Sequence, residues 1–99
     1  MTIEKSLIGT ALEIRLGSRL DTMTAPEPEA ELSQSTAGAD SLTPDFGNLE
    51  YISSAGLRVL LSAHKAMSSI GGMKIMHANK IVQEVFDVTG FSDILTIEP

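Results

Sequence analysis

Two adjacent serines, Ser53 and Ser54, stand where one periodicity of the sequence gives way to another. They lie in the stretch EYISSAGLRVLL, residues 50–61, between a short apolar run and a segment with helical spacing. A hydroxyl at such a turn can cap the helix by accepting a hydrogen bond from a free backbone N–H. It can also carry a phosphoryl group, which brings about -1.5 to -2 charges to the positive end of the helix.

Capping needs only one serine, and it does not require the small residues that follow. Ala55 and Gly56 extend the run of small side chains to four residues. Four small residues at a corner leave the backbone accessible to another molecule. We therefore expect an exposed corner that a modifying enzyme or a partner protein can reach.

The pattern around the serines does not fit a hydrolase. A nucleophile elbow has glycine two positions before and two positions after the serine, whereas Ile52 and Gly56 flank Ser54 at these positions. His64 and His77 show no ordered acidic partner, and two histidines without a carboxylate pattern do not form a metal site. We expect no catalytic residue, no metal site and no bound cofactor.

Length and composition exclude several other classes. A chain of 99 residues buries one modest core, so residues 1–99 are expected to form a single domain. The net charge of -6 provides no basic face for a nucleic acid. Cysteine is absent, which excludes disulfides and thiolate chemistry. Residues 1–16 contain no apolar segment long enough for a signal peptide or membrane insertion, so we expect a cytoplasmic protein.

The elements that position the serines begin with a hairpin. Residues 11–16 alternate as a half-buried strand, and residues 2–8 are expected to pair with it antiparallel through a turn at Gly9 and Thr10. After Gly17, residues 18–35 are expected to contain the start of a helix. Its predicted features are Thr24 as N-cap with Glu27 completing a capping box, Pro26 in the first turn, and an end before Gly38.

Residues 39–52 should supply a strand that leads into the serines. It is the weakest strand of the pattern, because Pro44 removes a backbone donor and Gly47 weakens the alternation. A helix of about four turns follows from Ala55. Its predicted polar face holds Arg58, Ser62, Lys65 and Ser69, and its predicted apolar face holds Val59, Leu60, Ala63, Ala66, Met67 and Ile70.

Further elements complete the fold class. Gly71 and Gly72 stop the long helix, residues 73–78 form a short strand, and Asn79 caps another helix that Gly90 ends, before a short last element. Strands alternating with helices predict an α/β domain with a mixed, partly parallel sheet of four to five strands and helices packed on it.

Three stretches carry a resemblance to a known family: LGSRLDTMTAPEPEAEL, LEYISSAGLRVLLSAHKAM and VQEVFDVTGFSDIL. With them the chain resembles the STAS-domain anti-sigma factor antagonists of bacteria along essentially its whole length. The resemblance implies a partner switch, in which the unmodified protein binds an anti-sigma factor that is also a serine kinase, and a sigma factor is released. Phosphorylation of Ser54 with ATP breaks this complex, and a serine phosphatase resets it.

The resemblance also implies which residues contact the partner. Gly17 to Asp21 is the second signature of the family and lies near its phosphorylation site. The expected partner-binding residues are Asp21, Ser53, Ser54, Ala55, Gly56, Leu57, Arg58 and Leu61. Leu57 and Leu61, with His64, lie on a flank of the helix that the core does not obviously claim; on the pattern alone such residues more often form an edge of the core than an interface. Asp21 could be a turn residue, and Arg58 a solvated cation.

The sequence departs from the family pattern at three places. Ser53 stands where the family often has aspartate, so either serine could be the acceptor, with Ser54 the position that aligns. Ala55 replaces a frequent second hydroxyl residue. The strand SLTPDF replaces a run of branched apolar residues.

Two other functions stay open on the same fold. One is a STAS subunit or scaffold that is never phosphorylated and binds an ATPase of a transport system; the SSAGL block favours the switch over this alternative. The other is a small-nucleotide or lipid-binding module, for which the sequence offers no phosphate loop. We expect the chain to be monomeric when alone.

Overall fold

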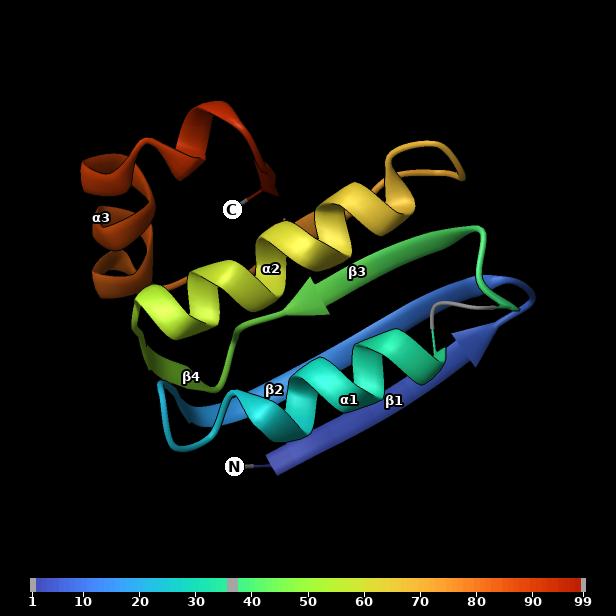
Figure 1. The fold of residues 1–99 in the computed structure, drawn as a ribbon, viewed down its shortest axis with the longest axis horizontal. Helices are drawn as coiled ribbons and strands as arrows, with labels where there is room; N and C mark the ends of the chain where they lie inside the picture. The colour runs from blue at the N-terminus through green and yellow to red at the C-terminus, as the bar shows by residue number, and fades with distance from the viewer. Residues whose placement is uncertain (1, 36–37, 99) are drawn as a thin grey trace.

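The computed structural model describes residues 2–35 and 38–98, which form a sheet with helices packed on it (Figure 1). The strands of this part of the chain are β1 (Thr2–Ile8), β2 (Ala11–Leu20), β3 (Ser41–Asp45), β4 (Leu49–Ile52), β5 (Lys74–Met76) and β6 (Thr96–Glu98). The helices are α1 (Pro26–Ser35), α2 (Ser54–Met67), α3 (Lys80–Thr89) and the short 3-10 helix η2 (Phe91–Asp93).

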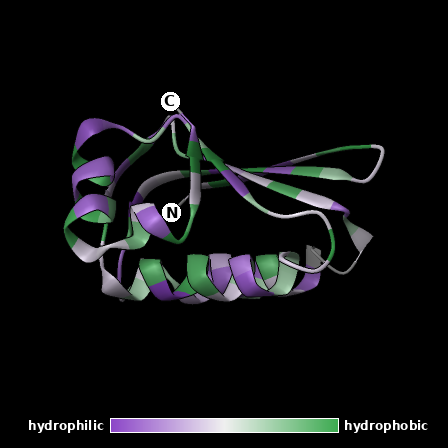
Figure 2. Ribbon diagram, turned by 90° about the horizontal axis from the view of Figure 1, so that it is seen from above, coloured by the Kyte–Doolittle hydropathy of each residue, from purple (hydrophilic) through white to green (hydrophobic). Residues whose placement is uncertain are grey.

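The sheet is mixed, as predicted. The strand order is β1-β2-β3-β5-β6, and β4 pairs with β2 beside this path. β1 is antiparallel to β2, and the other pairs are parallel. α1 and α2 lie side by side on one face of the sheet, and α3 stands at one end (Figures 1 and 2). The sheet has six strands rather than four to five, because residues 39–52 give two strands and the C-terminal residues pair with β5.

The predicted hairpin is confirmed, but β2 runs further than expected. Gly9 adopts a φ of 63°, which suits the tight turn between β1 and β2. Ser18–Leu20 continue β2 and pair with β4, so within residues 18–35, where the sequence predicts the start of a helix, only those from Pro26 on are helical. The register shifts after Ser18, whose φ is 72°. This irregularity lets one strand pair with β3 along its first half and with β4 at its end.

The capping box predicted at the start of α1 is wrong. The helix begins at Pro26, as its position suggested, but the Thr24 hydroxyl serves the preceding turn. It accepts a hydrogen bond from the Asp21 N–H at 2.8 Å and donates one to the Arg19 carbonyl at 2.8 Å. A threonine hydroxyl bonds local backbone groups in turns as readily as in helix caps, and here it bonds the turn.

Pro44 lies buried inside the parallel part of the sheet. The Leu42 N–H donates to the Gly72 carbonyl at 3.2 Å, and the Phe46 N–H donates to the Met76 carbonyl at 2.9 Å. Proline at the position midway between them cannot donate to β5, so the ladder between β3 and β5 is sparse. The predicted weakness of this strand is therefore confirmed, although the strand lies inside the sheet.

Helix α2 is amphipathic and four turns long, as predicted. Val59, Leu60, Ala63 and Met67 are buried, and the polar face is exposed. Two members of the predicted apolar face are exposed instead, Ala66 and Ile70. Ile70 lies beyond the last helical residue, in a turn where the N–H groups of residues 70–72 all bond the Met67 carbonyl.

Both predicted caps of α3 are confirmed. The Asn79 side-chain oxygen accepts from the Val82 N–H at 2.8 Å, and Gly90 ends the helix with a φ of 81°. The Asn79 amide nitrogen also donates to the Leu49 carbonyl at 2.9 Å. One side chain thus caps α3 and ties it to β4, at the end of the sheet where the serines lie.

Gly56 allows the first turn of α2 to approach the sheet closely. A Cβ added to it would lie 2.7 Å from the Ile52 Cγ1, 2.8 Å from the Leu20 Cγ and 2.9 Å from the Leu20 carbonyl oxygen. Real Cβ atoms do not approach neighbours this closely, and a backbone carbonyl inside a sheet cannot move easily. Gly56 is therefore required for packing.

Gly56→Ala is expected to lower the free energy of unfolding by about 1–3 kcal/mol, because the added methyl overpacks the contact with β2 and β4. Urea denaturation followed by circular dichroism measures this. Gly38→Ala is the matched control, since a Cβ there meets nothing within 4 Å, and its stability should stay within about 0.5 kcal/mol of the wild type or rise slightly. Equal stability of the two variants would contradict the packing argument.

Candidate functional site

The two serines occupy different positions at the N-terminus of α2. Ser53 is the N-cap residue, with extended backbone angles, and Ser54 is the first helical residue. The Ser53 N–H donates to the Leu20 carbonyl at 2.9 Å, and the Ser53 carbonyl accepts from the Leu57 N–H at 3.0 Å. The backbone of Ser53 therefore joins the end of β2 to the first turn of α2.

The hydroxyls of the two serines differ in access. Ser54 is exposed. The Ser53 hydroxyl oxygen is buried and has no hydrogen-bond partner within the described part of the chain. It makes no cap bond either, so the capping role considered for these serines is not filled by Ser53. Only Ser54 offers its hydroxyl to another molecule.

The Asp21 side chain organises the turn between β2 and α1. Its carboxylate accepts hydrogen bonds from the Met23 N–H at 3.0 Å and the Thr24 N–H at 3.2 Å, and it lies 3.5 Å from the Arg19 Nε. Leu20, the residue before it, carries the carbonyl that binds Ser53. The second signature segment thus lies against the serine corner, and Asp21 is at least a turn residue.

The same contacts set the ionisation of Asp21. Partial burial acts to raise the pKa of the Asp21 carboxyl, but the hydrogen bonds from the Thr24 and Met23 N–H groups, the Thr24 hydroxyl and Arg19 together hold this pKa below 3.8. The carboxylate is therefore ionised at neutral pH, and the turn is ordered around its negative charge.

Arg19, which the sequence did not single out, completes this turn. Its guanidinium carbon lies 4.8 Å from the centroid of the Tyr51 ring, over which it stacks, while its Nε pairs with Asp21. Arg19 and Tyr51 face each other because β2 and β4 are parallel partners in this register. Only the register of two distant segments reveals the contact.

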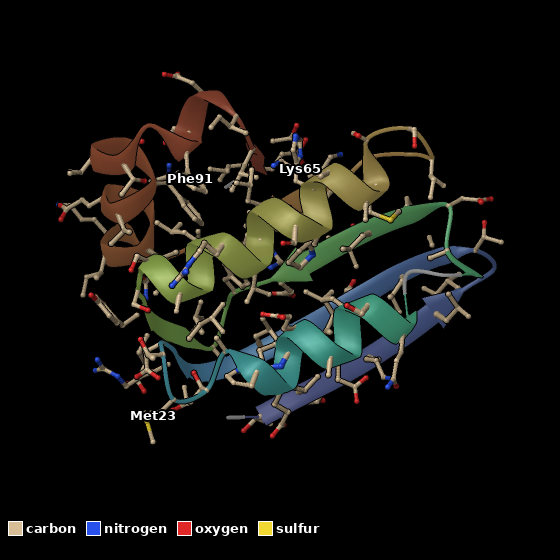
Figure 3. All side chains as sticks on the ribbon, viewed as in Figure 1. Met23, Lys65 and Phe91 are labelled. Carbon is tan, nitrogen blue, oxygen red and sulfur yellow. The ribbon has the colours of Figure 1, made fainter. Side chains whose placement is uncertain are left out.

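Met23 is a second residue that sequence reasoning missed. It is 88% exposed at the tip of the Asp21 turn and points away from the body of the protein (Figure 3). A flexible, exposed methionine can make adaptable apolar contacts. Its signal in the sequence is only an apolar residue inside a polar turn.

The remaining predicted contact residues divide by burial. Arg58 is exposed and Leu61 is half-buried. Leu57 is 4% exposed and belongs to the core, so the interpretation of this residue as an edge of the core holds and an exposed contact by its side chain does not. Ala55 and Gly56 are also buried, and the expectation that four small residues leave this backbone open is wrong for these two. Their small size serves close packing between α2 and the sheet.

A cleft of about 400 Å³ runs beside the serine corner, between the start of α1 and the first half of α2. Glu29 on α1 and Arg58 on α2 lie on it, and both are exposed. Its full lining is Thr22, Ala25, Pro26, Glu29, Ala55, Arg58 and Ser62. The cleft mixes apolar and charged groups and is open to a protein side chain.

The expectation that His77 has no acidic partner is wrong. Its Nδ1 lies 3.0 Å from an Asp45 carboxylate oxygen, because β3 and β5 are neighbours in the sheet. Partial burial acts to raise the pKa of Asp45, but the Gly47 N–H and His77 lower it on balance. This pair forms no hydrogen bond with the serines, and residues 2–35 and 38–98 contain no group of three metal-ligating side chains.

No helix in the described ranges is long and apolar enough to cross a membrane.

Acid is expected to weaken the fold partly through Asp21. Its pKa is lower in the folded state than in the unfolded chain, so its contribution is fully present above the unfolded pKa near 3.8 and is lost as the pH falls through the folded value. Carbon-detected NMR titration should place this pKa below 3.8. In Asp21→Asn, the free energy of unfolding should fall less steeply as the pH is lowered below neutrality. A pKa of Asp21 at or above its ordinary value would contradict the hydrogen-bonded turn.

Comparison with known proteins supports one family. A model of the STAS domain family matches residues 2–99. BtrV of Bordetella bronchiseptica, named as an anti-sigma factor antagonist, is 38% identical over 80 residues, which are 79% of this chain and 69% of BtrV.

Solved structures share the fold. The crystal structure of an anti-sigma factor antagonist from Mycobacterium paratuberculosis has a TM-score of 0.91 at 18% identity and covers 99% of this chain and 85% of its own. The Bacillus protein SpoIIAA is similar in its unphosphorylated form (TM-score 0.82, 17% identity, 99% and 89% coverage) and in its phosphorylated form (0.75, 16%, 99% and 92%). From the family match and the identity with BtrV, the chain belongs to the STAS-domain anti-sigma factor antagonists.

Proposed function

We propose that this protein is the antagonist in a partner switch. Its unmodified form binds an anti-sigma factor that is also a serine kinase, which frees a sigma factor. The kinase then phosphorylates Ser54, the complex breaks, and a serine phosphatase restores the unmodified form. The observation that carries the proposal is the access of the two hydroxyls, since Ser54 is exposed at the corner, whereas the hydroxyl oxygen of the half-buried Ser53 is buried.

The chemistry asked of this chain is passive. The Ser54 Oγ attacks the γ-phosphorus of ATP, the new Oγ–P bond forms as ADP leaves, and the hydroxyl proton passes to a base of the kinase. The kinase supplies the nucleotide, the magnesium ion and the base. This chain supplies a hydroxyl held on a helix end that is fixed by Gly56 and Leu20. It is a substrate and a binding protein, not an enzyme.

The phosphate would change binding without unfolding the protein. It adds about -1.5 to -2 charges at the positive end of α2, where the first turn contains no acidic residue. The proposed partner surface also includes the exposed Met23 and the half-buried Leu61, both suited to apolar contact. Burying a phosphate against such a contact costs desolvation, so the partner is released.

In this scheme residues 1–99 act as one domain, as a monomer when alone, in the cytoplasm where ATP and sigma factors are found. The partner surface is the serine corner with the Asp21 turn and the exposed side of α2. Support for this placement comes from the family and from the contact between the two signature segments through the Leu20 carbonyl.

Variants of Ser54 separate the switch from a structural role. Ser54→Ala should stay bound to the kinase after Mg-ATP is added, because it cannot accept the phosphoryl group. Ser54→Asp should bind about tenfold or more weakly, because it places a negative charge in the contact with the partner. Both should unfold within about 0.5 kcal/mol of the wild type, since Ser54 is an exposed residue. Ser53→Ala is the control and should still be phosphorylated.

The measurement is capture of partners from the host lysate on the wild-type protein, with mass spectrometry of bait and partners before and after Mg-ATP. A captured serine kinase, a phosphate on Ser54 and release of the kinase would support the switch. Capture of a transport ATPase with Ser54 unmodified would overturn it in favour of a STAS subunit that is never phosphorylated. A large loss of melting temperature in both Ser54 variants would make the serine a structural cap.

A further inference from the structure

Arg58 is an exposed cation one helical turn from Ser54. The two residues are four positions apart on α2, so their side chains lie on the same face, about 5–6 Å apart at Cβ. Side chains on a helix lean toward its N-terminus, which carries the long Arg58 side chain toward Ser54. Within residues 2–35 and 38–98, Arg58 takes part in no ion pair and no hydrogen bond.

The other arginine near the corner is already engaged. Arg19 pairs with Asp21 at 3.5 Å and stacks over Tyr51 at 4.8 Å. Releasing it would cost both of these contacts. Arg58 is therefore the cation at this corner that can take a new anionic partner without breaking an existing contact.

We propose that Arg58 binds the phosphate on Ser54 within the same chain. This inference rests on the proposed function, because it concerns the phosphorylated form of the same site. The guanidinium presents a planar fork of N–H donors that matches two phosphate oxygens. Phosphorylation then has two effects on the partner surface: it adds negative charge, and it withdraws the positive charge of Arg58 from the partner.

Glu29 is the competing anion. It lines the same cleft as Arg58, but the two side chains form no ion pair in the unmodified protein. Arg58 is thus open to a carboxylate of a partner in this form. A phosphate with nearly two charges, held one turn away on the same helix, attracts Arg58 more strongly than the single charge of Glu29 across the cleft.

The test uses protein carrying phosphoserine at position 54, installed by genetic encoding, so that it does not depend on any kinase. Phosphorus NMR follows the second pKa of the phosphate, ordinarily near 6, as pH changes. An adjacent guanidinium favours the dianion, so this pKa should be lower in the wild type than in Arg58→Gln by about 0.3 units or more. The charged neighbours Arg19, Asp21, Glu29 and Glu50 are the same in both proteins.

Two further variants make the result specific. Arg58→Lys keeps the charge but loses the fork, and should lower the pKa by less than the wild type does. Lys65→Gln removes an exposed cation from the far half of the same helix, about 16 Å along the helix axis from Ser54 (Figure 3). The phosphate of this variant should have the same second pKa as that of the wild type. The wild-type shift should shrink in about 1 M salt, where the screening length is about 3 Å.

Equal titration of the wild type and Arg58→Gln would overturn the internal pair and leave the proposed switch intact. Absence of phosphate on Ser54 in the kinase experiment would contradict the switch, while the titration of the encoded phosphoserine would still report on Arg58. Circular dichroism melts of each variant confirm that the folds compared are the same.

Discussion

The close approach of α2 to the ends of β2 and β4 is the constraint on which the site depends. It exists because residue 56 has no side chain, and a single added carbon would lie within 3 Å of the Leu20 carbonyl oxygen and of two side-chain carbons. The same Leu20 carbonyl accepts the Ser53 N–H. Packing and hydrogen bonding together therefore fix the start of α2 against the last residue of β2. Ser54 is held beside the Asp21 turn as a result, on a corner that cannot shift independently of the sheet.

The change of partner along β2 makes this corner possible. The strand pairs with β3 at Ala11–Arg15 and with β4 at Ser18–Leu20, with an irregular register between the two. Arg19, in the second half of β2, stacks over Tyr51 of β4. In the turn that follows β2, the Asp21 carboxylate accepts backbone hydrogen bonds. Asn79 adds a third attachment by joining α3 to the Leu49 carbonyl. Three segments that are distant in sequence thus support one exposed serine: β2 with the turn after it, β4 with the start of α2, and α3.

The start of α2 has no negative charge of its own. The first turn of α2 contains no acidic residue, the Ser53 hydroxyl does not cap it, and Arg58 stands one turn further without a partner among the described residues. The helix end therefore has unused capacity for an anion. Asp21, in contrast, is fully committed to the backbone of its own turn and to Arg19. The hydrogen bonds of Asp21 therefore involve neither Ser54 nor Arg58.

The sequence by itself determined the features that depend on neighbours along the chain. The hairpin at Gly9, the four-turn helix after the serines, and the Asn79 and Gly90 caps follow from local periodicity and turn chemistry. Ser54, in contrast, became the candidate acceptor through the family resemblance, because local chemistry left either serine open. Tertiary structure decided what depends on long-range pairing. It extended β2 to Leu20, gave the Thr24 hydroxyl to the Asp21 turn, buried Leu57, and joined His77 to Asp45. A periodicity shows that one face of an element is apolar, but only the positions of the neighbouring strands and helices decide how wide the buried face is and which polar groups meet across it.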